Sequence, residues 1–298
     1  MILAYLALLI LVVYGFMLIV PKGYLFHELG QLPIYLFQVK KVPLDGLTSK
    51  KYKFGTHRRQ YFLLYESEKT KDTEKPVVVY FHGGGWTFGS PEQFAANAKF
   101  FTDLGYSVIM PSYRRLPFYR YQAITEDRMK KKKKIDEVLE EQQFKNRKII
   151  VGGLSAGANV AALLYFDKER LEKIGFAPSR FLGVMLHGAP VDLSRMVPTP
   201  ILYGYAGLPK SATFKRANPI SYLQAKENIP ILIIHGTHDG LVSYKCADSF
   251  RIRCEELRFE QLSFHTLPNG THLDSGRWAF EKGKSAKIIR KWLDTITV

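Results

Sequence analysis

The feature that most constrains the fold of this chain is a serine between two glycines, placed where two apolar runs meet in "KIIVGGLSAGANVAALL" at residues 148–164. The first run has the pattern of a buried strand and the second that of a helix. Glycine is unfavourable in the interior of either element, so the cluster indicates a sharp turn of the backbone. The sequence therefore predicts a strand–turn–helix unit that displays Ser155 at its tip.

Further apolar runs recur along the chain and alternate with helix-like segments. Continuous runs, typical of strands covered on both faces, lie at residues 77–81, 106–113, 148–153, 181–186 and 231–236. A strand-like pattern also starts at residue 57, and residues 259–267 form a more polar candidate. Helix-like segments lie at residues 91–104, 121–142, 156–173, 243–257 and 277–294. This alternation predicts a mostly parallel central sheet flanked by helices, in one α/β domain over residues 56–298.

Two segments fall outside this alternation. Residues 21–55 mix aromatic, basic and apolar side chains, and we expect one or two cap or linker helices there, over the membrane or over the active site. Residues 188–225 are long, proline-rich and weakly periodic, which favours a lid or a substrate-facing loop.

The first twenty residues, "MILAYLALLILVVYGFMLIV", contain no charged side chain. A helix of that length spans the hydrocarbon core of a bilayer. No lysine or arginine precedes the apolar stretch and no small-residue cleavage site follows it, which argues against a removable signal peptide. We therefore expect residues 1–20 to form an uncleaved, single-pass membrane anchor. The sequence leaves the side of the membrane undecided.

The chain carries a formal net charge of +16, and its densest basic run is "RMKKKKK" at residues 128–134. The acidic stretch "IDEVLEE" follows, so the pattern favours a solvated helix with separated charge blocks, with attraction to an anionic membrane surface as the alternative. No nucleic-acid motif accompanies the charge, and we expect no nucleic-acid partner. The role of Lys130–Lys134 and the oligomeric state stay open.

The two cysteines, Cys246 and Cys254, fall in one helix-like stretch. On a helix they would lie roughly 12 Å apart along the axis, too far for a disulfide, so we expect two buried thiols. The sequence has no CxxC motif and no His/Cys cluster, so we expect no metal site.

A serine hydroxyl becomes a nucleophile only beside a base, which an acid in turn orients. In folds that display serine on such a turn, the acid and then the histidine come later in the chain. Asp239 follows the apolar run "ILIIHG", and His272 lies in the loop after the last strand-like segment. We therefore predict a catalytic triad of Ser155, Asp239 and His272.

Neighbouring residues compete for these roles. His235 and His265 fall within strand-like runs and are interpreted as packing or surface histidines, and His238 precedes the position of the acid. Asp274 lies only two residues from His272, too close in sequence to orient its ring from across a site.

The stretch "HGGGW" at residues 82–86 follows the run "VVVYF". Its glycines allow backbone N–H groups to approach a ligand closely, and the N–H of Ala156 follows the nucleophile directly. Together they predict an oxyanion hole, the set of donors that stabilises the negatively charged oxygen formed when serine attacks an acyl carbon. The loop lacks the G-K-[ST] and G-x-G-x-x-G patterns of nucleotide-binding loops.

These motifs, with "SYRRLP" and "HGTHDGLVS", resemble the α/β-hydrolase carboxylesterases of the hormone-sensitive-lipase-like group, which includes the arylacetamide deacetylases. The resemblance covers roughly residues 57–298 and implies an α/β-hydrolase fold with a small helical cap formed by N-terminal residues. It also implies Gly83, Gly84 and Ala156 as oxyanion donors, Trp86 as a substrate contact and no metal or organic cofactor.

The chain departs from the family pattern at a few positions. Arg115 is the third residue of the Tyr113–Pro117 stretch, and "TFGSPE" after Trp86 lacks a common acidic residue. Asp127 is expected to fill the structural role of an aspartate that usually follows this stretch. These departures leave the substrate preference open.

The sequence thus predicts a serine esterase that cleaves carboxylic esters of short to medium acyl chain, small or lipid-like, through an acyl-serine intermediate. An amidase, deacetylase or peptidase using the same triad is the alternative within enzymes. A non-catalytic protein that binds a small ligand is the alternative of another class.

Overall fold

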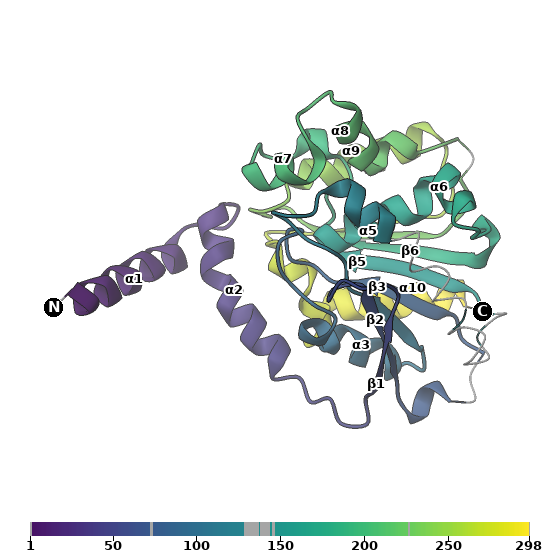
Figure 1. Cartoon of the computed structure of the whole chain (residues 1–298), viewed down its shortest axis with the longest axis horizontal. Helices are drawn as coiled ribbons and strands as arrows, with labels where there is room; N and C mark the ends of the chain where they lie inside the picture. The colour runs from purple at the N-terminus through teal and green to yellow at the C-terminus, as the bar shows by residue number, and fades with distance from the viewer. Residues whose placement is uncertain are drawn as a thin grey trace.

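The predicted apolar runs form the centre of one sheet in the computed structural model of the chain (Figure 1). The structure describes residues 2–71, 74–127, 137, 144, 147–225 and 227–297. Within them the sheet has eight strands in the order β1-β2-β4-β3-β5-β6-β7-β8. The strands are β1 (Thr48–Lys53), β2 (Tyr61–Glu66), β3 (Val77–Phe81), β4 (Val108–Pro111), β5 (Ile149–Leu154), β6 (Phe181–His187), β7 (Ile231–Gly236) and β8 (Leu262–Leu267).

The sheet is mixed but mostly parallel, as the alternation of strands and helices predicts. Strands β3 to β8 pair in parallel with their neighbours, whereas β2 runs antiparallel to both β1 and β4. The side chains of β3, β4, β5 and β7 are buried on both faces, which explains their continuous apolar sequences. The edge strand β8 is half-buried throughout, in agreement with its more polar sequence.

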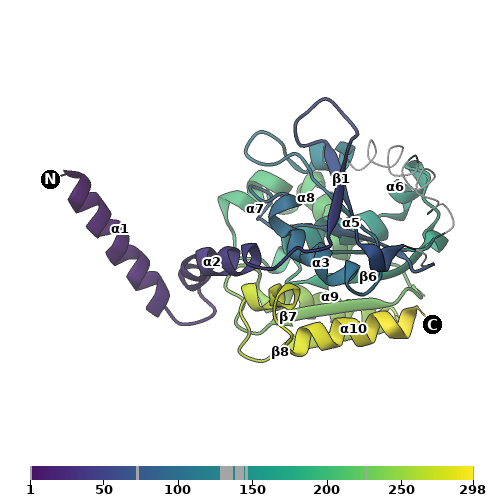
Figure 2. The ribbon, with the colours of Figure 1, turned by 90° about the horizontal axis from the view of Figure 1, so that it is seen from below.

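Helices cover both faces of the sheet (Figures 1 and 2). Alternate strand residues enter two separate cores, because successive side chains of a strand point to opposite faces. The helices α5 and α9 pack in one core, and α2, α3 and α10 pack in the other. Their bounds are α2 (Leu25–Lys40), α3 (Ala95–Thr102), α5 (Ala156–Phe166), α9 (Tyr244–Glu256) and α10 (Lys284–Ile296).

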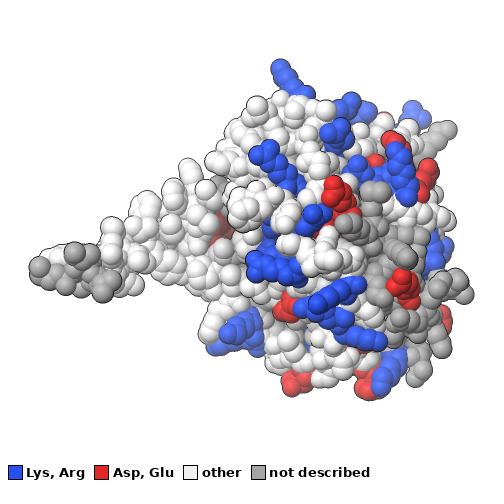
Figure 3. Space-filling view, viewed as in Figure 1, with Lys and Arg blue, Asp and Glu red and all other residues white. Residues whose placement is uncertain are grey.

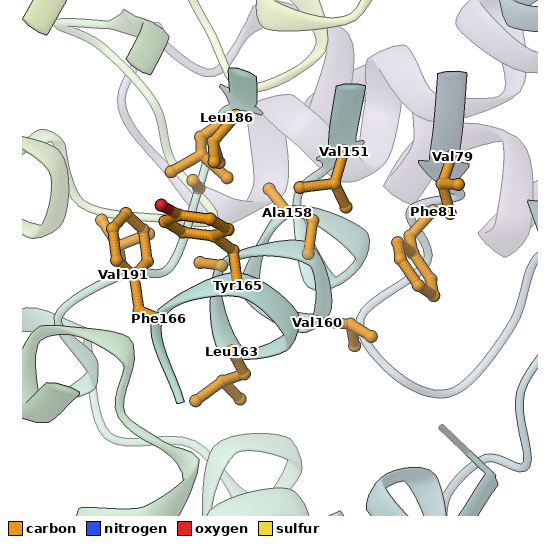
Figure 4. Packing of buried hydrophobic residues seen from close by; sticks show 14 of the residues in the cluster. Val79, Phe81, Val151, Ala158, Val160, Leu163, Tyr165, Phe166, Leu186 and Val191 are labelled. Atoms are coloured by element: carbon orange, nitrogen blue, oxygen red, sulfur yellow. The ribbon is translucent and has the colours of Figure 1, made fainter. Parts of the chain in front are cut away.

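Helix α5, which follows the glycine-flanked serine, lies at the centre of the first core (Figure 4). Its residues Ala158 and Val160 are buried in the same cluster as Val79 of β3 and Val151 of β5. Ten of its eleven residues are buried, so the helix is apolar on nearly all sides. The start of α5 therefore has a position determined by packing on every side.

The segment 21–55 contains one helix, α2, and a strand that the sequence did not predict. Residues 48–53 form β1, the antiparallel edge strand next to β2. All of its side chains except that of Tyr52 are exposed, so its sequence, "TSKKYK", lacks the apolar pattern of the central strands. The sheet thus extends into the stretch interpreted as cap and linker.

Helix α1 (Ile2–Ile19) extends away from the rest of the molecule (Figures 1 and 2). Its side chains from Tyr5 onward are mostly exposed and apolar. In the described part of the chain, no helix meets the length and hydropathy that crossing a membrane requires.

Other predicted segments differ in detail from the structure. The helix expected over residues 277–294 starts only at Lys284, as α10, after a short 3-10 turn at Arg277–Ala279. Residues 156–173 form two helices, since α6 (Lys168–Lys173) starts anew after Asp167, whose side chain caps its first turn. Residues 188–225 contain the short helices α7 (Pro200–Ala206) and α8 (Ala212–Ala217). The helix expected over residues 121–142 is described only for residues 121–127, and Lys130–Lys134 lie outside the described residues.

Cys246 and Cys254 are both buried on α9 as free thiols, as expected.

A buried isoleucine on β7, next to the edge strand β8, provides a test of this packing. Ile233 of β7 is fully buried, and Ile233→Ala should lower the free energy of unfolding by about 2–5 kcal/mol through lost burial and a cavity. Ile252, 43% exposed on α9, is the matched control, and Ile252→Ala should change it by less than about 0.5 kcal/mol. Urea denaturation measures both, and equal effects would contradict the packing described here.

Candidate active site

Ser155 lies on the sharp turn between β5 and α5, as the sequence predicts. Its backbone has φ 55° and ψ −124°, a conformation that residues other than glycine rarely adopt. A Cβ on Gly157 would lie 2.2 Å from the carbonyl oxygen of Phe81, and one on Gly153 would lie 2.4 Å from the carbonyl carbon of Gly157. Both flanking glycines are therefore required, because the turn brings backbone into direct contact with backbone.

The backbone of Ser155 is also held from the neighbouring strand. Its N–H donates a hydrogen bond of 2.8 Å to the carbonyl of His187, the last residue of β6. The His187 ring is buried against Tyr80, with 3.0 Å between the Tyr80 hydroxyl and Nδ1. Burial lowers the pKa of His187 to about 3, so this ring is neutral and structural.

Asp239 and His272 are brought together from the loops that follow β7 and β8. His272 Nδ1 lies 2.7 Å from Asp239 Oδ2, and both side chains are buried. The second carboxylate oxygen, Oδ1, accepts hydrogen bonds from the N–H groups of Leu241 (2.9 Å) and Val242 (2.7 Å). Because Nδ1 is occupied by the aspartate, Nε2 is the ring nitrogen left for another partner.

The electrostatics of this pair favour an ionised acid. Burial alone would raise the pKa of Asp239, but the charge of His272 and hydrogen bonds from His272 and His235 lower it well below its usual range. Burial alone would lower the pKa of His272, but the carboxylates of Asp239 and, to a smaller extent, Glu28 raise this pKa. The imidazole is thus made a stronger base than an ordinary histidine.

His235, interpreted from the sequence as a packing or surface histidine, contacts the acid of the predicted triad. Its ring is buried, and Nε2 lies 2.9 Å from the Val242 carbonyl and 3.2 Å from Asp239 Oδ2. The carboxylate of Asp239 is therefore shared by two imidazoles. The i, i+4 spacing of a histidine and an aspartate across "HGTHD" is the sequence signal that could have revealed this contact.

The other rival residues are occupied elsewhere. The Asp274 carboxylate accepts hydrogen bonds of 2.8 Å from the N–H of Thr271 and from Arg277 Nε. His238 is exposed and contacts the hydroxyl of the adjacent Thr237, and His265 is half-buried within β8.

The "HGGGW" loop lies against the serine. A Cβ on Gly83 would lie 3.6 Å from the Ser155 Cβ. Gly84 has φ 120°, and a Cβ on it would lie 2.3 Å from the Phe88 carbonyl oxygen, so this position requires glycine. Ala156 is the first residue of α5, where a backbone N–H has no acceptor within its own helix. Backbone of Gly83 and Ala156 thus lies next to Ser155, and Gly84 lines the same cavity as Ser155.

The stretch after β4 braces this loop. The Tyr113 hydroxyl donates a hydrogen bond of 2.9 Å to the His82 carbonyl, and the N–H of Leu116 donates one of 2.9 Å to the Trp86 carbonyl. Asp127 is fully buried and accepts hydrogen bonds from the backbone and the guanidinium of Arg114. The structural role expected for Asp127 is in keeping with these contacts.

Ser155 and His272 line one cavity of about 460 Å³, together with Gly83, Gly84 and Trp86. Trp86 stacks on Tyr205 at 4.1 Å between ring centroids and is nearly fully buried. Most of the remaining wall is apolar. It comes from α2, from the 188–225 segment and from the loop after Asp239, and includes Leu25, Leu29, Leu36, Val197, Ile201 and Leu241.

Among the described residues, no group of three or more His, Cys, Asp and Glu side chains is arranged so that it could hold a metal ion.

With this geometry in view, comparison with known proteins places the chain. The BD-FAE family model matches residues 63–253, more than half of the sequence. The chain belongs to the BD-FAE family. The stretch matched to BD-FAE includes Ser155 and Asp239 and ends before His272.

Curated relatives of this BD-FAE family member carry esterase or deacetylase names. Arylacetamide deacetylase-like 2 of Homo sapiens is 31% identical over 33% of this chain and 26% of its own length. Carboxylesterase 20 of Arabidopsis thaliana is 28% identical over 56% of this chain and 54% of its own length. The matched stretches thus span about a quarter to a half of these relatives.

Solved structures support the fold over nearly the whole chain. Esterase B from Lactobacillus rhamnosis superimposes with a TM-score of 0.73 at 17% identity, covering 91% of each chain. A bacterial heroin esterase gives 0.70 at 20% identity, covering 96% of each. At these identities the likeness shows the fold alone, and it confirms the α/β-hydrolase fold that the resemblance implies.

The close contact at the serine turn leads to a prediction. Gly157→Ala should lower the free energy of unfolding by about 1–3 kcal/mol or more, because its Cβ would lie 2.2 Å from the Phe81 oxygen. Gly283, at the N-cap of α10, has open space around its Cβ position and φ −80°, so Gly283→Ala is the matched control. It should lower the free energy of unfolding by no more than about 1 kcal/mol, the preference of an N-cap for glycine over alanine. Thermal or urea unfolding compares the two. A Gly157→Ala variant as stable as the control would show that the turn is looser than described.

Proposed function

We propose that this protein is a serine hydrolase that cleaves carboxylic esters through an acyl-serine intermediate. The observation that carries the proposal is the convergence on one cavity of Ser155, the buried His272–Asp239 pair and the glycine loop after β3. Membership of the BD-FAE family and the esterase names of relatives support the same chemistry.

In the first half-reaction, His272 Nε2 takes the proton of the Ser155 hydroxyl as Oγ attacks the acyl carbon. The negative charge that develops on the carbonyl oxygen is stabilised by N–H groups of Gly83, Gly84 and Ala156. The tetrahedral intermediate collapses, the bond to the alcohol oxygen breaks, and His272 returns its proton to the leaving alcohol. Water then repeats the sequence on the acyl-enzyme and releases the acid.

Asp239 supports the charged intermediate of this cycle. Its depressed pKa keeps the carboxylate ionised at neutral pH, and it faces the ring nitrogen of His272 that stays protonated throughout. Because the pair is buried, the attraction between the carboxylate and the imidazolium is screened less than it would be in water.

The shape of the cavity favours esters with a short to medium acyl chain. Its volume of about 460 Å³ accommodates a small ligand, and its wall is mostly apolar beyond the Ser155 and His272 end. Trp86, which is stacked on the buried ring of Tyr205, gives the wall an aromatic surface next to the glycine loop.

Removal of the nucleophile tests the proposal. Ser155→Ala should lower kcat on p-nitrophenyl esters by about four to six orders of magnitude, because the acyl-enzyme can no longer form. A fluorophosphonate probe should label wild type at Ser155 and leave the variant unlabelled. Ser221→Ala, at an exposed serine of the 219–222 turn, is the matched control and should keep wild-type kcat.

The same assay, run on esters of two to twelve acyl carbons and on matched amides, separates the remaining possibilities. We expect kcat/KM to be highest for short to medium acyl chains. Preference for the amides would favour an amidase or deacetylase. An unlabelled wild-type serine with no turnover would favour a non-catalytic ligand-binding protein and would overturn the proposal.

We also propose that the protein attaches to a membrane through α1, on the side that the sequence leaves undecided. The support is the surface of α1, which has no acidic or basic residue and exposes large apolar side chains such as Ile10, at 68%. Lys and Arg side chains lie on the body of the molecule, and the projecting helix carries none (Figure 3). Exposed apolar surface of this extent is typical of contact with lipid or with another protein. Such attachment would suit amphiphilic or lipid-derived ester substrates.

Charged substitutions on α1 test the attachment. Leu9→Asp with Val12→Asp should lower the fraction of full-length protein that floats with phosphatidylcholine vesicles by more than tenfold, because each carboxylate opposes burial in lipid. Leu208→Asp with Ile252→Asp, at exposed apolar positions of the body, is the matched control and should float like wild type. Equal flotation of both double variants would contradict the proposal.

A further inference from the structure

One acidic residue outside the predicted triad lies directly behind it. Glu28, in the first turn of α2, is 1% exposed although the helix around it is rich in apolar side chains. Its Oε1 accepts a hydrogen bond of 2.7 Å from the N–H of His272 and one of 3.1 Å from the N–H of Gly240. A single carboxylate oxygen thus joins the histidine loop to the loop that begins at Asp239.

The contacts around these hydrogen bonds are close. A Cβ on Gly240 would lie 2.5 Å from the Tyr24 carbonyl oxygen, so the acid loop is pressed against the start of α2. Further along the helix, the Tyr35 hydroxyl approaches the Gly276 carbonyl, and Gln38 Oε1 accepts a hydrogen bond of 3.0 Å from Arg277. Helix α2 therefore contacts the histidine loop along most of its own length.

The geometry points to a defined role for Glu28. We propose that Glu28 is a positioning residue of the active site, whose carboxylate on α2 holds the Asp239 and His272 loops in register through two backbone amides. This inference rests on the proposed hydrolase mechanism, since it assigns Glu28 to the placement of the acid and the base. Helix α2 is then a part of the catalytic centre as well as a wall of the substrate cavity.

Glu28 affects His272 through its negative charge as well as through its hydrogen bonds. The pKa of Glu28 is raised overall, because burial outweighs the charge of His272 and the two amide hydrogen bonds, which lower it. In turn Glu28 contributes, after Asp239, to raising the pKa of His272. The amides favour the ionised form of the carboxylate, because they donate to it.

The other ionisable groups near Glu28 contact groups other than its carboxylate. His235 faces Asp239 from β7. On the histidine loop, Arg277 pairs with Asp274 and Glu281. Before α2, Lys22 donates to the Asn269 carbonyl. His272 and Asp239 are therefore the ionisable groups through which loss of the Glu28 charge would be felt.

Two substitutions separate position from charge. Glu28→Leu removes the oxygen that accepts both amide hydrogen bonds. The kcat on the preferred ester should then fall by about 10- to 100-fold with KM changed less than about threefold, as expected when supporting hydrogen bonds are lost. Glu28→Gln keeps an acceptor oxygen, and kcat should return to within about fivefold of wild type.

The pH profile distinguishes this role from a merely structural one. His272 must be neutral to act, so the acidic limb of kcat/KM follows its pKa in the free enzyme. With the Glu28 charge removed, that pKa falls, and the limb of Glu28→Gln should move to lower pH by on the order of 0.5 unit. Glu169→Gln, which removes an exposed carboxylate on α6, is the charge control and should leave the limb in place.

The outcomes are distinguishable from failure of the hydrolase proposal. If wild type neither turns over esters nor reacts with a fluorophosphonate, the proposed function fails. If wild type is active and folded Glu28→Leu has wild-type kcat, only the inference about Glu28 is overturned. If Glu28→Leu does not fold, Glu28→Gln decides, and an acidic limb that coincides with that of wild type overturns the inference.

Discussion

The contact between the first turn of α5 and the ends of β3 and β5 is the constraint on which the active site depends. Gly153 and Gly157 allow backbone to meet backbone there, and no larger residue fits at either position without displacing a strand or the helix. Burial of α5 on nearly all sides keeps the contact closed. The unusual backbone conformation of Ser155 is maintained because the packing around it leaves no alternative path for the chain.

The parallel sheet brings the remaining groups to this point. Strands β5 to β8 run in the same direction, so their carboxyl ends, and the loops that leave them, lie along one edge of the sheet. Ser155 follows β5, Asp239 follows β7 and His272 follows β8. The loop after β6 also reaches this edge, since a Cβ on Gly188 would lie 3.1 Å from the His272 ring. Groups far apart in sequence thus meet because of the direction of the strands.

Features encoded in local sequence were predictable, and features encoded in long-range contacts were not. The central strands were found because burial on both faces requires a continuous apolar run, and Ser155 was found because its turn requires glycine. Strand β1 escaped because an exposed edge strand needs no apolar pattern. The contact of His235 with Asp239 escaped because its i, i+4 spacing is a weak signal, and a histidine in a strand can face either side of the sheet.

Glu28 illustrates the same limit for the active site. The sequence shows only that Glu28 is the one carboxylate of α2, a helix rich in apolar residues. The residues that Glu28 contacts lie more than two hundred positions further along the chain. Burial of a carboxylate is costly unless donors surround it, so a glutamate in such a setting signals that donors come from elsewhere in the fold.

The N-terminal helices and the catalytic domain form one physical unit despite their separation in sequence. Tyr35 and Val39 of α2 belong to the core beneath the sheet, together with residues of α3 and α10. Helix α1 in turn packs on α2, where a Cβ on Gly30 would lie 2.9 Å from Met17 Cβ. Helix α1 thus contacts the helix that carries Glu28. The sequence predicts a domain boundary at residue 55. The packing of α2 and the hydrogen bonds of Glu28 nevertheless join the residues before this boundary to the active site.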